Sequence, residues 1–132
     1  MGVPTNAIYN GMIVRTRTAS GKRTLAAVTD GLSNTLCVSE KRLMTTRYRD
    51  GDWHDDCGYM DGWDPDIMRL TGMQPMQDGP TGVSGYEFGS AHSGRMSALM
   101  GDGSVRSISY SINLTTFDRL GHASDGQTLG DF

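Results

Sequence analysis

The tripeptide Gly101-Asp102-Gly103 separates two runs that carry apolar residues, Arg95–Met100 and residues 104–110. An Asp-Gly pair between such runs is a strong signal for a β-hairpin. The primed turn of a hairpin needs positive φ at its centre, and glycine adopts positive φ without steric cost. We therefore predict an antiparallel hairpin over residues 95–110, with the rest of the chain arranged around it.

The side-chain pattern of the two runs agrees with a pair of strands. One face of the first run would carry three apolar residues, Met96, Ala98 and Met100. In the second run Val105 falls on one face, whereas Ile108 and Tyr110 fall on the other. This imperfect alternation indicates that both faces are partly covered or that a bulge changes the phase.

Further strands are predicted before the hairpin. Residues 34–43 alternate in a way that would place Leu36 and Val38 on one face of a strand. Residues 12–18 form a shorter β-prone run, which we interpret as an entry strand, and residues 67–70 could form one more short strand.

Two short helices are predicted from capping residues. Thr24 would cap a helix over residues 25–29, and Asn113 would cap a helix that Gly121 ends. The 18 glycines among 132 residues are about twice the usual frequency and predict long glycine-rich loops, such as residues 71–85, to which we assign no core role. The sequence thus predicts a single α+β domain over residues 1–132, with a twisted antiparallel sheet centred on the 95–110 hairpin.

His92 is followed, after nine intervening residues, by Asp102 and Gly103. This spacing resembles the signature of the prepilin-type processing-associated H-x9-D-G domains, which are pilin-like proteins of uncertain biochemical role. Other positions fit the same pattern in chain order: Asp30, Gly31, Glu40, Trp63, Asp64, Asp66, Arg69, Leu120 and Gly121.

The resemblance implies a non-catalytic pilin-like head domain in the cell envelope or outside the cell, with a structural or assembly role. Its partners would be copies of itself or other pilin-like subunits. Relatives of this kind usually begin with a long apolar helix, whereas no apolar run here approaches the ~20 residues of a membrane span. The net charge of −3, without a basic cluster, argues against a nucleic-acid partner.

The loop over residues 48–66 is crowded with aspartates and aromatic residues and offers an alternative function. Calcium takes six to eight oxygen ligands from flexible loops, so Asp61, Asp64 and Asp66 could bind one calcium ion. The flat rings of Tyr48 and Trp53 could instead stack on a glycan. The structural interpretation is that Asp64 and Asp66 pair with Arg69 and that Trp63 packs in the core.

A hydrolase that uses His92 is a second alternative. It requires an acid and a hydroxyl or metal beside the imidazole. Asp102 would lie at the far end of a hairpin arm, so we prefer a role for His92 in anchoring a loop and for Asp102 in capping its turn. For Glu40, near the end of the strand predicted over residues 34–43, we expect an ion pair with Lys41, Arg42 or a nearby arginine rather than a role as a buried acid.

Two further possibilities remain open. A zinc or iron site could use His54, Asp55, Asp56 and His92, although their spacing matches no recognised motif. Cys37 and Cys57 could form a disulfide in an exported protein or remain free thiols.

Overall fold

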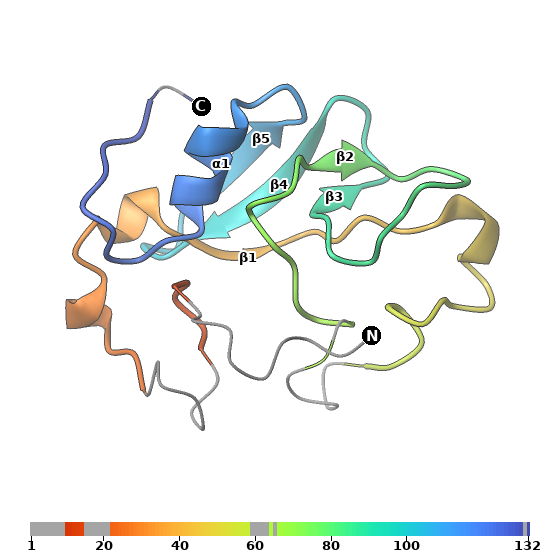
Figure 1. The fold of residues 1–132 in the computed structure, drawn as a ribbon, viewed down its shortest axis with the longest axis horizontal. Coiled ribbons are helices and arrows are strands. Elements are labelled where there is room, and N and C mark those ends of the chain that lie inside the picture. Colours follow the sequence, from red (N-terminus) through yellow and green to blue (C-terminus); the bar gives the residue numbers. More distant parts are fainter. Residues whose placement is uncertain (1–9, 15–21, 59–63, 65, 131) are drawn as a thin grey trace.

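The computed structural model describes residues 10–14, 22–58, 64, 66–130 and 132. Figure 1 shows a small α+β domain, as the sequence predicts. Its labelled elements are β1 (Leu36–Ser39), β2 (Met76–Gln77), β3 (Gly89–Ser90), β4 (Arg95–Met100), β5 (Val105–Ser109) and α1 (Leu114–Leu120). Three short 3₁₀ turns lie at Leu25–Ala27, Leu32–Asn34 and Thr45–Arg47.

The predicted hairpin is confirmed. β4 and β5 pair antiparallel from Leu99 opposite Val105 to Arg95 opposite Ser109, and β1 adds to the other edge of β4 to give the sheet order β1-β4-β5. The turn type differs from the prediction. The N–H of Gly103 donates to the carbonyl of Met100 at 3.1 Å, and φ is +86° at Gly103. Only glycines have positive φ among the described residues, so Asp102 does not, and the predicted primed turn is wrong. A three-residue loop needs the left-handed conformation only at its last position.

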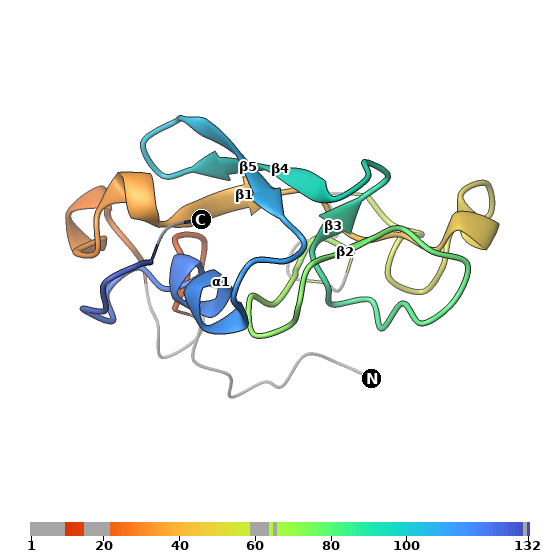
Figure 2. The same cartoon turned by 90° about the horizontal axis from the view of Figure 1, so that it is seen from above.

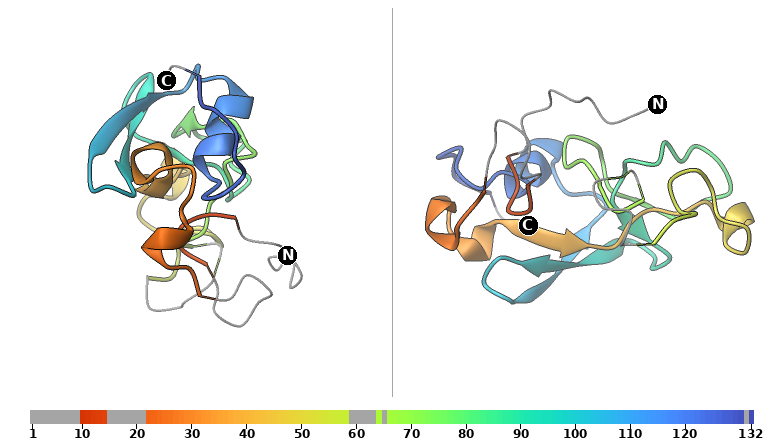
Figure 3. Two further views of the ribbon diagram at one scale, coloured as in Figure 1. Left: turned by 90° about the vertical axis from the view of Figure 1, so that its left-hand side faces the viewer. Right: turned by 90° about the horizontal axis from the view of Figure 1, so that it is seen from below.

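The core lies between one face of this sheet and α1. The alternation predicted for β4 is present, because Met96, Ala98 and Met100 are each 1% exposed. Phe117 and Leu120 of α1 are completely buried against this face. Figure 2 shows α1 beneath the three strands, and the left view of Figure 3 shows α1 and the C-terminal segment on the same side of the sheet.

β1 differs from its prediction in both length and phase. It ends at Ser39 instead of extending to residue 43. Leu36 lies opposite Met100 and Val38 opposite Leu99, so Cys37 is an extra residue in β1. An extra residue reverses the alternation of side chains. Leu36 is therefore buried while Val38 is 52% exposed, and the prediction that they share a face is wrong.

The two predicted helices differ in outcome. Asn113 caps α1 as expected, since its Oδ1 accepts from the N–H groups of Thr115 and Thr116 at 2.9 and 3.2 Å. The helix predicted over residues 25–29 is only the 3₁₀ turn Leu25–Ala27, where the Thr24 side chain makes no capping bond. No residue of that turn is buried, and a segment this short is not helical without tertiary packing.

Three other segments, residues 12–14, 67–70 and 71–85, do not match their predictions in the described structure. Residues 12–14 are not in a strand, residues 15–18 lie outside the described residues, and residues 67–70 are turn and coil. The 71–85 segment, expected to have no core role, contains β2, which pairs parallel with β3. Gly89 makes this pairing possible, because a Cβ there would lie 1.9 Å from the carbonyl oxygen of Met76.

Candidate functional site

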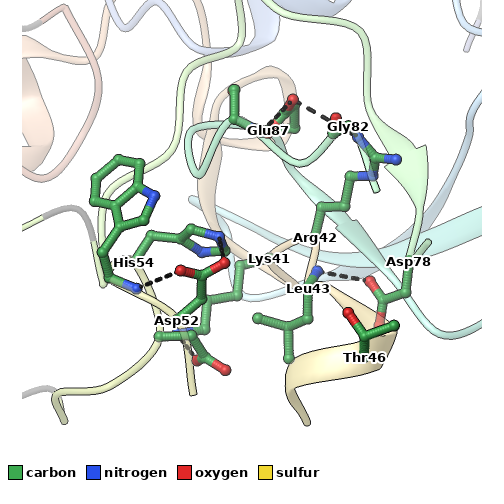
Figure 4. A network of polar contacts seen from close by, with 12 residues as sticks. Lys41, Arg42, Leu43, Thr46, Asp52, His54, Asp78, Gly82 and Glu87 are labelled. Atoms are coloured by element: carbon green, nitrogen blue, oxygen red, sulfur yellow. Dashed lines mark hydrogen bonds and ion pairs between the residues drawn. The ribbon is translucent and has the colours of Figure 1, made fainter. Parts of the chain in front are cut away.

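Two adjacent cations, Lys41 and Arg42, anchor the segment after β1 by binding different parts of the chain. Lys41 forms an ion pair with Asp55 and donates to the carbonyl of Asp66 at 3.0 Å. Arg42 is buried and lies 3.7 Å from the carboxylate of Glu87 (Figure 4). The expected pairing of Glu40 with Lys41 or Arg42 is therefore wrong, because both cations bind carboxylates of later segments.

Arg42 and Glu87 form a buried, well-bonded pair. The Arg42 guanidinium donates to the carbonyls of Gln77 and Gly82 at 3.0 and 2.7 Å. Both oxygens of Glu87 accept from the N–H of Ser84 at 3.1 Å. Burial alone would raise the pKa of Glu87, but these hydrogen bonds and the Arg42 charge outweigh it and hold the pKa below its usual range. The pair connects the segment after β1 to the segment before β3.

Asp66 is a second buried acidic residue, with 2% of its surface exposed. Burial raises its pKa, but hydrogen bonds outweigh this effect, chiefly one from the N–H of Cys57 at 3.2 Å, and the nearby Lys41 charge acts in the same direction. The pKa of Asp66 is therefore lowered. The N–H of Asp66 in turn donates to Asp64 Oδ1 at 3.2 Å.

The predicted calcium ligands are only partly described. Asp61 lies outside the described residues, as does Trp63, for which core packing was expected. Asp66 instead groups with Asp56 and Cys57, whose ligand atoms all lie within 4.8 Å of one another. This is the only group of three or more His, Cys, Asp or Glu at such distances in the described part of the chain.

Arg69 lies near enough to Asp66 for the charge of that carboxylate to act on its guanidinium. Its guanidinium donates to the carbonyls of Met68 and His54 at 2.7 and 3.4 Å. Burial lowers the pKa of Arg69, and the charges of Asp55, Asp66 and Glu87 oppose that effect without reversing it.

His54 is completely buried, and its ring lies edge-on to Trp53 at a centroid distance of 5.3 Å. Its Nε2 is 3.8 Å from Asp52 Oδ2 (Figure 4). Asp55 pairs with Lys41, and Asp56 groups with Cys57 and Asp66. The described residues His54, Asp55, Asp56 and His92 therefore do not converge, and the zinc or iron set considered from the sequence is not assembled.

The two aromatic residues considered for glycan stacking have different surroundings. Tyr48 is 52% exposed, and its hydroxyl donates to Asp78 Oδ2 at 2.5 Å. This hydrogen bond, with smaller contributions from burial and the Asp78 charge, raises the pKa of Tyr48 to about 12. Trp53 is 46% exposed and packs edge-on against Tyr86.

A cavity of about 980 Å³ lies beside β1. Its walls are largely apolar and include Leu36, Met68 and Phe88, with Asp66 among the polar lining residues. Both cysteines line it as free thiols, so the disulfide alternative is not present in this structure.

Glu40 and His92, two of the motif residues, meet beside the start of β4. His92 Nε2 lies 3.7 Å from Glu40 Oε1, and the other carboxylate oxygen accepts from the N–H of Ser97 at 2.6 Å. The backbone of His92 is held on both sides, by Ser90 Oγ and by the Tyr110 hydroxyl, each at 3.2 Å. The His92 ring itself stays largely in solvent.

The motif residues Asp102 and Gly103 form the turn at the other end of β4. Asp102 Oδ1 accepts from the hydroxyl and the N–H of Ser104 at 2.6 and 2.9 Å. These two hydrogen bonds hold the pKa of Asp102 below its usual range. His92 and Asp102 therefore lie at opposite ends of β4 and do not form a catalytic pair with each other.

Sequence reasoning missed the Glu40–Ser97 bond, the Arg42–Glu87 pair and the place of Cys57 beside the aspartates. The first two join segments far apart in the chain and leave no local pattern. The third had a local signal, since Asp55-Asp56-Cys57 places a thiol directly after two carboxylates.

These observations define a small α+β domain with a three-stranded antiparallel sheet, one covering helix and an acidic, cysteine-containing loop. The chain belongs to a family of proteins of unknown function, DUF1559 (SBP_bac_10), whose model matches residues 4–115. No curated protein and no solved structure matches the chain significantly. Within the described residues, no helix has the length and apolar character needed to cross a membrane.

Proposed function

We propose that this domain is the non-catalytic globular head of a pilin-like protein of the cell envelope, with a role in structure or assembly. The observation that carries this proposal is the use of the motif residues. Asp102 and Gly103 build the turn of the central hairpin, and Glu40 bonds the N–H of Ser97. His92 contacts Glu40. Each of these residues thus supports the sheet, as expected if the motif serves the scaffold.

The uncovered face of the sheet supports an assembly role. Val38 lies opposite Leu99, and Leu99 lies opposite Val105, so the three side chains form one row across the strands. They are 52%, 37% and 71% exposed, respectively. An exposed apolar row of this kind favours contact with a second subunit, either a copy of this chain or another pilin-like protein.

The test joins an apolar helix of about 20 residues to the N-terminus of the chain and expresses the fusion in bacteria. Electron microscopy of material sheared from the cells should show fibres. A Val105→Lys fusion should lose them, while a Thr115→Lys fusion, changed on the exposed side of α1, should keep them. A fusion that stays monomeric in the membrane would contradict the assembly role.

Divalent-metal binding by the acidic loop is a second candidate, favoured by the grouping of Asp56, Cys57 and Asp66. Calcium prefers oxygen ligands, whereas zinc accepts thiolate and carboxylate together. The thiol therefore favours zinc over calcium, the ion considered as an alternative from the sequence.

Calorimetric titrations with Zn²⁺ and Ca²⁺ separate these possibilities. Zinc binding should be lost in Cys57→Ser and kept in Cys37→Ser, which removes the other thiol of the cavity. Calcium binding that survives Cys57→Ser would favour a carboxylate-only site instead. The absence of heat with both ions would refute metal binding.

A further inference from the structure

A hollow of about 370 Å³ lies on the solvent side of the sheet, where the chain enters β4. It is lined by His92, Ser93, Arg95, Met96, Ser97 and Ser107. Ser97 and Ser107 are directly opposite each other in the β4–β5 register. Directly opposed residues place their side chains on the same face, so the two hydroxyls lie together.

The hollow is rich in hydrogen-bond donors that no other part of the described chain uses. The Arg95 guanidinium and the hydroxyls of Ser93, Ser97 and Ser107 have no partner among the described residues. All four of these residues are exposed to solvent. A ligand that accepts several hydrogen bonds at once would satisfy them together.

Arg95 contributes a positive charge to the hollow. Glu40 contacts two residues of the hollow without lining it, since its two oxygens face the Ser97 N–H and the His92 ring. None of the described carboxylates forms an ion pair with Arg95, although the Glu40 charge lies close by. Because the whole chain carries a net charge of −3, it does not attract anions in general, and an anion bound here would be held by local groups.

We propose that this hollow binds a tetrahedral oxyanion, a phosphate or sulfate group. A guanidinium donates through two parallel N–H groups to two oxygens of such an anion, and hydroxyls donate to the others. A neutral saccharide would leave the Arg95 charge unused. This site is separate from the acidic loop and does not depend on the assembly role.

The test is an NMR titration of the ¹⁵N-labelled chain with inorganic phosphate and with sulfate. Sodium chloride keeps the ionic strength constant and serves as the non-specific control. Amide shifts should cluster at residues 92–97 and 107. Arg95→Ala should weaken binding about tenfold or more, since a charge-assisted hydrogen bond is worth at least the equivalent of a tenfold change. Arg49→Ala, which removes an exposed arginine outside the hollow, should leave binding unchanged.

Two further variants sharpen the result. Arg95→Lys keeps the charge but loses the paired N–H groups, so its affinity should lie between those of the original chain and Arg95→Ala. Ser107→Ala should weaken binding without changing the melting temperature. Tighter binding of phosphate than of sulfate would assign the site to phosphate esters, and the reverse order to sulfate esters.

Three outcomes would overturn the proposal. Equal shifts in a titration with sodium chloride alone would show a non-specific response to salt. Unchanged binding in Arg95→Ala would remove the hollow from the site. Shifts at the same amides with a neutral saccharide, of equal size in Arg95→Ala, would assign the hollow to a different ligand.

Discussion

The backbone N–H of Ser97 in β4 donates a hydrogen bond of 2.6 Å to the carboxylate of Glu40, which directly follows β1. The N–H of Glu40 donates in return to the carbonyl of Ser97 at 3.4 Å. The two residues therefore continue the pairing of β1 with β4 past Ser39, with a side chain in the place of one backbone acceptor.

Replacing Glu40 should weaken this junction. We expect Glu40→Ala to lower the free energy of unfolding by about 1–2 kcal/mol, because the Ser97 N–H loses a charged acceptor. Glu40→Gln should cost about half as much, since the amide oxygen still accepts a hydrogen bond. Urea denaturation followed by circular dichroism measures both values, and an unchanged midpoint in Glu40→Ala would refute a stabilising role.

Removing Arg42 should be more damaging. Arg42→Ala leaves the Glu87 carboxylate buried without its cation, which typically costs about 3–5 kcal/mol. The double variant Arg42→Met with Glu87→Gln should recover part of that loss, because no charge is then left buried. Arg49→Ala, an exposed control, should change the unfolding free energy by less than about 0.5 kcal/mol. Equal effects of Arg42→Ala and Arg49→Ala in the same denaturation assay would contradict the pair's importance.

The turn of the hairpin gives a test of backbone strain. Gly103 has φ +86°, so Gly103→Ala should destabilise the domain by about 1–2 kcal/mol. Gly58 does not have positive φ, and a Cβ there meets nothing within 4 Å. Gly58→Ala should therefore be neutral or slightly stabilising. Thermal unfolding compares the two, and Gly103→Asn should be milder than Gly103→Ala because asparagine tolerates this conformation better.

Asp102 should make the hairpin sensitive to acid. Its pKa is lowered in the fold by the hydrogen bonds from Ser104, so its contribution is fully present above the ordinary carboxyl value, near pH 4. That contribution is lost as the pH falls through the lower pKa of the folded state. The melting temperature of Asp102→Asn should therefore approach that of the original chain as the pH falls below about 4. Asp66 and Glu87 titrate in both proteins, so the difference between the two curves isolates Asp102, and a constant difference would contradict the assignment.

Local signals account for the parts of the fold that the sequence predicts well. The Asp102-Gly103 turn and the alternation in β4 lie within one short stretch, and Asn113 caps α1 from the adjacent position. The phase of β1 could not be predicted in this way. It depends on how Cys37 is accommodated opposite β4, which is a property of the partner strand.

The candidate sites show the same difference between local signals and long-range contacts. The acidic loop was evident from composition, because its aspartates are close in sequence. The long-range contacts of the site residues were not evident from the sequence. Glu40, for example, contacts His92 and Ser97 only once β1 is paired with β4. The parallel pairing of β2 with β3 was also hidden, because it depends on the close approach that Gly89 allows.

The sheet order β1-β4-β5 also predicts an order of folding events. The β4–β5 pairs are local, and hairpins of this kind form in about 1–10 μs. Glu40 and Ser97, by contrast, are 57 positions apart. Pairing of β1 with β4 therefore closes a long loop, which costs more conformational entropy than closing the hairpin. Closure of that segment, rather than formation of the hairpin, should therefore limit the folding rate.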